Sequence, residues 1–250
     1  MHPHEGQTNP RSRLRERALD PRPVIAILIL ALLTVALLSA RGFGQGRLAA
    51  NHPSGVSVAR LHYTGGGDWY WGSSAVPNLL EFVRDNTNWP VDTLEGRVSV
   101  DEEELFDYPF LCATGHGVMR FSESDRERLR AYLNAGGFLF INDSYGMGPS
   151  VVEELAALFP DREPAELPFS HEIYHSFYDF PNGPPKIHEH DNKPPRGYGI
   201  LLGDRVAVYF LLESDIGDGW EDSHVHNDPP DKRLAALQMG VNLLAYALTH

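Results

Sequence analysis

Two His-x-His motifs indicate that this chain could bind a metal ion. Six of its twelve histidines lie between positions 171 and 226, and four of them form the segments HEHD (188–191) and HVHND (224–228). In an extended segment, residues i and i+2 face the same side, so both imidazoles can bind Zn²⁺ or another divalent ion. The candidate metal ligands are His188, His190, Asp191, His224 and His226. The alternative is that the two loops fold on each other and hydrogen-bond their histidines to the backbone.

Acidic and aromatic side chains surround these motifs. The acidic run 215–222 (DIGDGWED) offers oxygen ligands for Ca²⁺, although its spacing is not that of an EF-hand. Aromatic faces beside carboxylates suit a sugar-like or peptidoglycan-like ligand, and packing in the core explains the same residues equally well. The aromatic residues concerned are Trp69, Tyr70, Trp71, Tyr145, Tyr174, Tyr178 and Trp220.

Three short segments that follow predicted strands supply the other candidate site residues: GGGDW (65–69), GHG (115–117) and NDSYG (142–146). Because the carboxyl ends of parallel strands line the ligand crevice of open α/β sheets, we expect these segments to meet at one edge. The candidate catalytic residues are His116, Asp143 and Ser144, and the candidate ligand-binding residues are Gly65, Gly66, Gly67, Asp68, Trp69 and Tyr145. The alternative is that the glycines only form tight turns and that the aspartates cap helices.

The strands and helices that must position these residues alternate along the chain. Apolar patterns predict strands at 56–63, 97–100, 109–114 and 138–141, and a hairpin of strands at 198–202 and 205–212. Apolar stripes at helical spacing predict helices at 77–88, 122–135, 150–159 and 231–248. This order predicts a doubly wound α/β domain with a largely parallel sheet. His116 and Asp143 then follow neighbouring strands joined by one helix.

The stretch 160–197 contains no periodic element. Such a long irregular segment in a compact domain usually covers a functional surface. Its polar groups need partners, so we expect the 188–191 loop to fold over the edge that holds His116 and Asp143.

Local signals mark where the helices begin and end. The residues expected at these positions are Ser122 and Gly136 for the 122–135 helix, Ser150 as the start of a capping box, and Asp228 or Asp231 before the last helix.

Charge and cysteine content exclude several classes of function. Residues 1–47 carry seven arginines and three acidic residues, whereas the rest of the chain carries 14 basic and 31 acidic residues. A domain this acidic is poorly suited to bind nucleic acid. A single cysteine excludes an internal disulfide and a multi-cysteine metal site. Cys112 lies between Leu111 and Ala113 in an apolar run, so we expect it to be packed and inert.

The first 55 residues are organised differently from the rest. An arginine-rich stretch (1–23) precedes an uncharged apolar segment of seventeen residues (24–40), a linker (41–55) and the folded domain (56–250). The apolar segment predicts either an uncleaved membrane anchor or a signal peptide that is removed, which would release a secreted domain. In both cases the arginines stay in the cytoplasm and the domain lies outside it.

Six longer segments together resemble one bacterial family. They are LHYTGGGDWY (61–70), NLLEFVRDNTN (78–88), DYPFLCATGHG (107–117), LRAYLNAGGFLFINDSYG (129–146), YDFPNGPPKIHEHD (178–191) and ESDIGDGWEDSHVHNDP (213–229). On these segments the chain resembles the DUF4159 domain family. The resemblance implies a domain attached to the bacterial cytoplasmic membrane and facing the periplasm. It also implies a fold like class I glutamine amidotransferases and ThuA-like proteins, with flavodoxin-like layering.

The resemblance to amidotransferases does not extend to their nucleophile. In those enzymes a cysteine follows the strand that comes after a Gly-Gly helix end, and here that position falls near Asn142 and Asp143. Thiol catalysis is therefore not expected. We expect a membrane-attached ligand-binding or scaffold domain, whose ligand is a protein or a glycan-like molecule. The alternative is a metal-assisted hydrolase, with zinc or a similar ion, that uses His116, Asp143 and the His-x-His loops.

Overall fold

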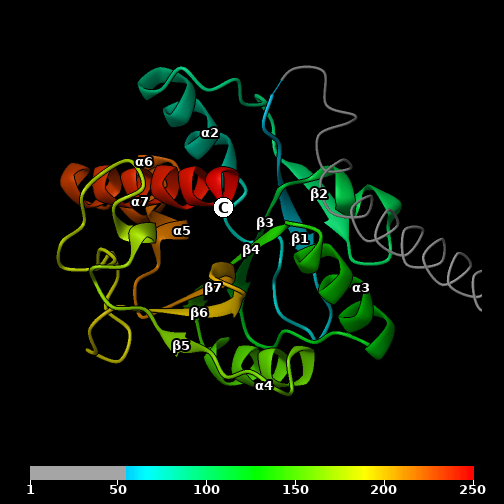
Figure 1. Ribbon diagram of the computed structural model, residues 1–250. Helices are drawn as coiled ribbons and strands as arrows, with labels where there is room; N and C mark the ends of the chain where they lie inside the picture. The colour runs from blue at the N-terminus through cyan, green and yellow to red at the C-terminus, as the bar shows by residue number, and fades with distance from the viewer. Residues whose placement is uncertain (1–54) are drawn as a thin grey trace, which may run out of the picture. The chain divides into compact units, whose positions relative to one another are not determined.

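A seven-stranded sheet forms the centre of the domain (Figure 1). The computed structural model describes residues 55–250. Five strands are parallel in the order β2-β1-β3-β4-β7, and β6 and β5 continue the sheet as antiparallel strands. The strands are β1 (Val58–His62), β2 (Gly96–Ser99), β3 (Phe110–His116), β4 (Phe138–Tyr145), β5 (Ala165–Glu166), β6 (Arg196–Leu202) and β7 (Arg205–Leu212). The predicted mixed α/β fold with a largely parallel sheet is confirmed.

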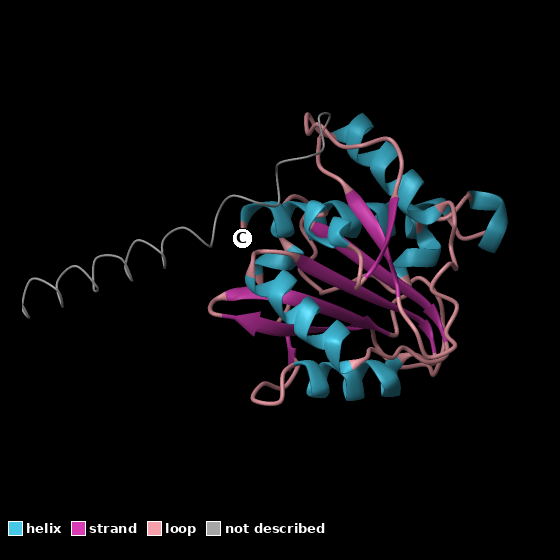
Figure 2. Ribbon diagram, turned by 90° about the vertical axis from the view of Figure 1, so that its right-hand side faces the viewer, coloured by secondary structure: helices cyan, strands magenta, loops and turns pink. Residues whose placement is uncertain are grey.

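Helices cover both faces of this sheet (Figure 2). The helices are α2 (Ala75–Asn86), α3 (Glu123–Asn134), α4 (Gly148–Leu158), α5 (Ile216–Gly219), α6 (Ser223–His226) and α7 (Pro230–Thr249), with short 3-10 helices at Glu103–Asp107 and Glu172–Tyr174. Side chains of α2, α5 and α7 pack with Phe110 and Phe140 in one apolar cluster. Side chains of α3 and α4 pack with Leu111 and Ile141 in another. Successive strand residues point to opposite faces, which places these neighbours in different layers.

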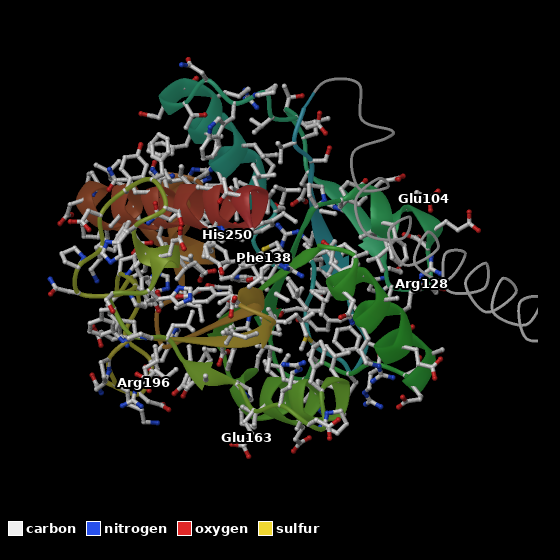
Figure 3. The ribbon with its side chains drawn as sticks, in the orientation of Figure 1. Glu104, Arg128, Phe138, Glu163, Arg196 and His250 are labelled. Atoms are coloured by element: carbon white, nitrogen blue, oxygen red, sulfur yellow. The ribbon has the colours of Figure 1, made fainter. Side chains whose placement is uncertain are left out.

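The continuous apolar runs of β3 and β4 explain why these strands lie in the middle. Strands that are buried on both faces lack polar alternation. Phe138 at the start of β4 is fully buried and lies centrally in Figure 3, whereas Glu104, Glu163 and Arg196 are exposed.

β3 and β4 extend further than their apolar runs predicted. Residues 115–116 and 142–145 belong to the strands rather than to loops, and Gly115 pairs in register with Asp143. Asn142 and Ser144 stay buried in β4 because they hydrogen-bond to each other, and Ser144 also to Thr114. The polar residues are therefore part of the sheet itself.

The helix ends agree with the sequence only for α3. Ser122 and Asp125 form a capping box, and Gly136 follows the helix with φ 108°. The capping box predicted at Ser150 is wrong, because α4 begins at Gly148 and the Ser150 hydroxyl donates to the Met147 carbonyl.

The predicted caps of the last helix are also wrong. α7 begins at Pro230 after Pro229, with no side-chain cap. Oδ1 of Asp228 instead lies 3.1 Å from Nε2 of His188, so this carboxylate pairs with a histidine and does not cap the helix.

Several contacts hold the segment 160–197 to the rest of the domain, among them two at its middle and its end. The Asn242 side chain of α7 accepts hydrogen bonds from the Phe177 and Tyr178 amides and donates one to the Tyr178 carbonyl. The Ile187 amide donates to the Ser214 carbonyl at 2.8 Å. These contacts bring the 188–191 loop to the carboxyl end of β7, as expected.

No helix within residues 55–250 is long and apolar enough to cross a membrane. The predicted arginine-rich stretch, the membrane or signal segment 24–40 and the linker up to residue 54 lie outside the residues that the structure describes.

Cys112 should be unreactive in the folded protein. Its side chain is 2% exposed and packs in the apolar layer of α2 and α7. Burial raises the pKa of the Cys112 thiol to about 12. We expect a thiol reagent such as DTNB to label the chain only after unfolding, and Cys112→Ala to lower the free energy of unfolding by about 1 kcal/mol. Rapid labelling of the native protein would contradict this prediction.

Candidate functional site

Three residues with unfavourable backbone angles gather at the carboxyl edge of the sheet. Tyr145 ends β4 with φ 146°, and Glu213 and Asp215, just after β7, have φ values of 60° and 64°. Non-glycine residues in such conformations cost about 1–3 kcal/mol each and persist where the surroundings hold them. The strain indicates that this edge is a constrained site.

Asp215 is the centre of a buried polar cluster at this edge. Its side chain is 1% exposed. Nδ1 of His188 lies 2.9 Å from it, Nδ2 of Asn142 donates to it at 3.2 Å, and Nε2 of His190 lies 3.4 Å away. The cluster therefore joins β4, the end of β7 and the 188–191 loop.

His226 extends the cluster along α5 and α6. Its Nε2 atom lies 2.8 Å from Glu221 and 3.4 Å from Asp218. Asp218 Oδ2 is also 3.5 Å from Nδ1 of His188, and the rings of His188 and His226 have their centroids 5.0 Å apart. Both histidines thus share Asp218.

The cluster carries opposed charges in a largely buried place. Hydrogen bonds to Asp215 and Asp218 raise the pKa of His188 to about 10. Burial alone would raise the pKa of Asp215, but hydrogen bonds from His188, His190 and Asn142 lower it to about 2. Burial raises the pKa of Asp218. The protonated ring of His188 carries the positive charge that offsets the buried carboxylates of Asp215 and Asp218.

His188, Asp218 and His226 have the geometry to hold a metal ion. One ligand atom from each lies within 4.8 Å of the other two. Their elements are the 184–195 loop, α5 and α6, which are brought together only in the folded domain. Two imidazoles and one carboxylate are ligands that zinc accepts.

The β1 side of the edge is fixed by a buried arginine. Arg60 of β1 is fully buried and forms an ion pair with Glu95 at 3.0 Å. The same guanidinium donates to the carbonyl oxygens of Trp71 and Gly72. Trp71 then donates its indole N–H to Asp218 at 3.1 Å. The buried Arg60 therefore holds Trp71 against Asp218, one member of the group His188, Asp218 and His226.

His116 contacts the same indole ring. Its ring is edge-on to that of Trp71, with centroids 4.9 Å apart. Nδ1 of His116 is 3.1 Å from Asp68 Oδ2, and the other oxygen of Asp68 accepts the backbone N–H of His116. Trp71 thus contacts both His116 and Asp218. Among the described residues, no hydrogen bond joins His116 to His188, Asp218 or His226.

Asp143 and Ser144 point into the structure instead of into a crevice. The Asp143 carboxylate accepts the backbone N–H groups of Tyr145, Met147 and Gly148 at 2.9–3.0 Å. It therefore caps α4, which is the structural alternative considered for the aspartates of these segments. Burial raises the pKa of Asp143, although these three N–H groups oppose the shift. The Ser144 hydroxyl is buried against Thr114.

The triple glycine packs one loop on another. The Gly67 amide donates to the Val118 carbonyl at 3.0 Å, and a Cβ atom at Gly67 would lie 2.7 Å from the His116 carbonyl oxygen. Gly65 and Gly66 have φ values of 106° and 92°, which favour glycine. The neighbouring Trp69 packs against His62 with ring centroids 4.4 Å apart and the rings tilted by 36°. These residues shape the loop that carries Asp68.

The remaining predicted residues lie at the rim or outside the cluster. Tyr145 stacks on His190, with centroids 5.0 Å apart, and its hydroxyl is 3.4 Å from Asp191. Asp191 is exposed and pairs with Lys193. His224 is exposed too, and no residue of the described part of the chain hydrogen-bonds to it. Residues 223–226 form the helix α6. The imidazoles of His224 and His226 therefore do not face the same side, as they would in an extended segment.

Sequence reasoning did not select Arg60 as a site residue, and it considered Trp71 only among the aromatic residues that suit a glycan-like ligand. Arg60 has a visible signal, because it is a charged residue between two apolar residues in a strand, Ala59 and Leu61. Asp218 lies within the acidic run that was considered for Ca²⁺. Only the folded arrangement shows that it faces two histidines.

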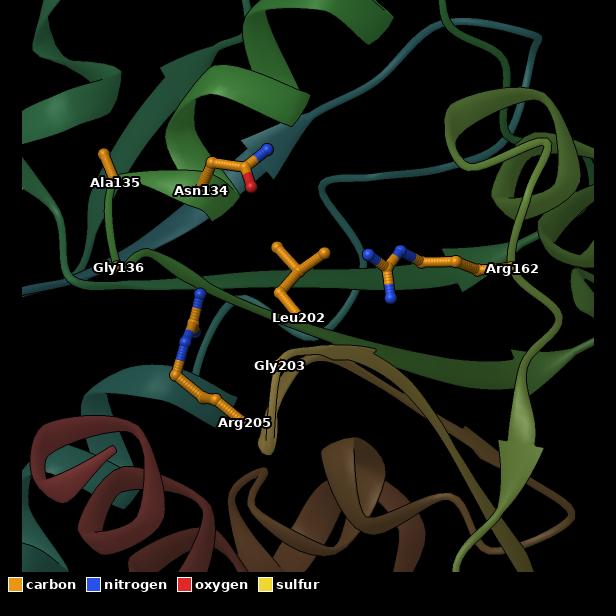
Figure 4. A pocket seen from close by; sticks show the side chains of 7 residues that line it. All are labelled: Asn134, Ala135, Gly136, Arg162, Leu202, Gly203 and Arg205. Carbon is orange, nitrogen blue, oxygen red and sulfur yellow. The ribbon is translucent and has the colours of Figure 1, made fainter. Parts of the chain in front are cut away.

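A hollow of about 300 Å³ lies away from this edge, beside the ends of α3 and the β6–β7 hairpin (Figure 4). It is lined by two arginines, but both already donate to carbonyl oxygens. Arg205 donates to Leu133 and Gly137, and Arg162 donates to Leu201. The arginines of this hollow are therefore already engaged in holding the backbone of the domain.

Comparison with known families identifies one match. The family described as "Domain of unknown function (DUF4159)" matches residues 57–248. No curated protein matches the sequence.

Asp143 should contribute to stability as the cap of α4. We expect Asp143→Ala to lower the free energy of unfolding by about 1–3 kcal/mol, because three N–H groups, two of them buried, lose their acceptor. Urea unfolding measures the change. Asp101→Ala removes an exposed carboxylate and serves as the control, with an expected change below about 0.5 kcal/mol. Equal effects of the two substitutions would contradict the capping role.

Proposed function

The chain belongs to the DUF4159 family, and on that premise we propose that its domain is a ligand-binding domain that holds a divalent metal ion such as zinc. The observation that carries this proposal is the group His188, Asp218 and His226, whose ligand atoms lie within 4.8 Å of one another. Three protein ligands leave a fourth tetrahedral position for water or for an atom of a bound ligand. The metal ion would therefore be part of the binding surface.

The surroundings of His188 support a metal site. A ligating histidine usually hydrogen-bonds through its second ring nitrogen to a carboxylate, which fixes the ring and raises its basicity. Asp215 lies 2.9 Å from Nδ1 of His188, and Asp228 lies 3.1 Å from Nε2. Whichever nitrogen binds the ion, the other retains a carboxylate partner.

The fold that we propose is the amidotransferase-like fold without its thiol chemistry. The parallel strand order β2-β1-β3-β4-β7 supports it, since this is the order of flavodoxin-like sheets. In enzymes with a nucleophile elbow, the nucleophile occupies a strained strand-to-helix turn. The strained residue between β4 and α4 is Tyr145, and Cys112 is buried within β3. These positions support binding without a cysteine nucleophile.

The proposed location of this domain is outside the cytoplasm, attached to the bacterial membrane through residues 24–40. An uncharged apolar segment preceded by arginines supports this orientation. The acidic domain makes nucleic acid an unsuitable partner, and a protein or a glycan-like molecule remains the proposed ligand class.

A second candidate is a metal-assisted hydrolase. The specific observation that favours it is His116, whose side chain is 37% exposed and which shares the Trp71 indole with Asp218. Bound zinc would supply Lewis acidity in such a reaction. Asp143 was expected to take part in the hydrolysis. It has no catalytic role in this candidate, because its carboxylate caps α4.

Zinc binding tests the proposed function directly. The full chain, purified in detergent without a histidine tag and treated with a chelator, should take up one zinc ion in isothermal titration. His188→Ala and His226→Ala should each weaken the affinity by more than about 100-fold, since losing a ligand costs at least as much as losing its outer partner. His224→Ala is the matched control and should bind as the wild type does. Wild-type affinity in all three variants would contradict the site.

The orientation can be tested with reporters fused after His250. Alkaline phosphatase, which folds only outside the cytoplasm, should be active in this fusion, and a cytoplasm-dependent reporter should be inactive. The mass of the mature protein shows whether residues 24–40 are retained. An inactive phosphatase fusion together with an active cytoplasmic reporter would contradict the proposed location.

A further inference from the structure

The imidazole of His116, which is not part of the proposed metal site, is held in a single orientation. Asp68 contacts His116 with both carboxylate oxygens: Oδ2 lies 3.1 Å from Nδ1, and Oδ1 accepts the backbone N–H. A carboxylate accepts hydrogen bonds only, so Nδ1 of the neutral ring must carry the hydrogen. Nε2 therefore carries the lone pair, as in other Asp–His pairs.

The lone pair of His116 is available to a ligand. Within residues 55–250, no group hydrogen-bonds to Nε2, and the side chain is 37% exposed. The edge-on Trp71 ring limits rotation of the imidazole. Gly115 has φ 137°, and a Cβ atom there would lie 2.6 Å from the Tyr63 hydroxyl, so the backbone before His116 needs glycine. The loop is built to present this ring.

The position of His116 in the sheet is a typical ligand-binding position. The connections from β1 and β3 leave in opposite directions along the sheet, and open α/β sheets bind ligands outside the carboxyl ends of the strands at such a point. His116 lies at the end of β3, and its register partner on β4 is Tyr145. Three side chains at this rim are strongly exposed: Tyr70 at 62%, Tyr145 at 53% and Val118 at 40%.

The charge beside His116 restricts the substrate. The Asp68 carboxylate lies 3.1 Å from Nδ1 of His116 and is not a ligand of the proposed metal ion. An anionic substrate would be repelled by this carboxylate. The exposed aromatic rings favour a substrate with an apolar or aromatic part.

We infer that His116, positioned by Asp68, is the general base and acid for hydrolysis of a neutral or cationic carboxylic ester. A water molecule transfers a proton to Nε2 of His116 while its oxygen forms a bond to the ester carbonyl carbon. The tetrahedral intermediate then breaks the carbon–oxygen bond to the alcohol, and Nε2 returns the proton to the leaving oxygen. The products are a carboxylic acid and an alcohol, and the imidazole is unchanged.

Water is the nucleophile in this scheme because no side-chain nucleophile pairs with His116 among the described residues. The Ser144 hydroxyl is buried and hydrogen-bonded to the Thr114 hydroxyl, and Cys112 is buried in β3. The inference rests on the second candidate function, hydrolysis, and assigns it a base that does not depend on the identity of the metal ion.

Hydrolysis of 4-nitrophenyl acetate by the full chain tests this assignment. His116→Gln should lower kcat by about 100-fold or more, the usual contribution of general base catalysis. Asp68→Asn should lower kcat by about 10–100-fold with KM unchanged, since it alters the orientation of the base and not the binding of the ester. His224→Gln removes an exposed histidine and should leave the rate unchanged. The anionic ester 4-nitrophenyl phosphate should be a poorer substrate than the acetate.

The outcomes separate this inference from the metal site. Equal rates for wild type and His116→Gln, including no hydrolysis by either, would overturn the role of His116. A faster reaction with the phosphate ester would overturn the substrate class. Zinc titration of the same variants should give wild-type affinity. Absence of zinc binding together with a loss of rate in His116→Gln would contradict the proposed metal site and leave the assignment of His116 standing.

Discussion

The buried carboxylate of Asp215 organises the carboxyl edge of this domain. A charge that is removed from water is strongly destabilising unless it is paired and hydrogen-bonded. Asp215 is satisfied by side chains from two distant parts of the chain, Asn142 of β4 and the histidines at 188 and 190. The long irregular segment therefore has a defined course at its end. The strained φ of Asp215 is held by the same contacts.

A second buried charge has the equivalent role on the β1 side. Arg60 is neutralised by Glu95, and its remaining donors hold the backbone of Trp71 and Gly72. This contact fixes a loop that contains few apolar residues facing the core. Because Trp71 contacts both His116 and Asp218, the two histidine sites share one indole. Loss of either charge pair would disturb both sites.

The two histidine sites differ in how their rings are used. His188 has carboxylates at both nitrogens, so one nitrogen keeps a carboxylate partner when the other, deprotonated, binds a cation. His116 has a carboxylate at one nitrogen only, and its other nitrogen has no hydrogen-bond partner among the described residues. This arrangement suits proton transfer. Tyr145 occupies the strained turn where a nucleophile would stand in related architectures, so the chemistry that we propose depends on water and not on an enzyme-bound intermediate.

Much of the fold was predictable from the sequence, because apolar periodicity determines which segments form strands and helices. The runs of β3 and β4, the Ser122 cap and the helix order required only local information. The placement of His116 and Asp143 on neighbouring strands followed from the rules of parallel sheets. The pairings within the site did not follow. Asp143 caps a helix because α4 starts two residues earlier than its sequence signal, and Asp228 pairs with a histidine because the irregular segment folds back onto β7. His226 joins the cluster and His224 does not, because HVHND is helical. Such choices depend on contacts between residues far apart in the chain, and only the tertiary structure decides which buried charge meets which partner.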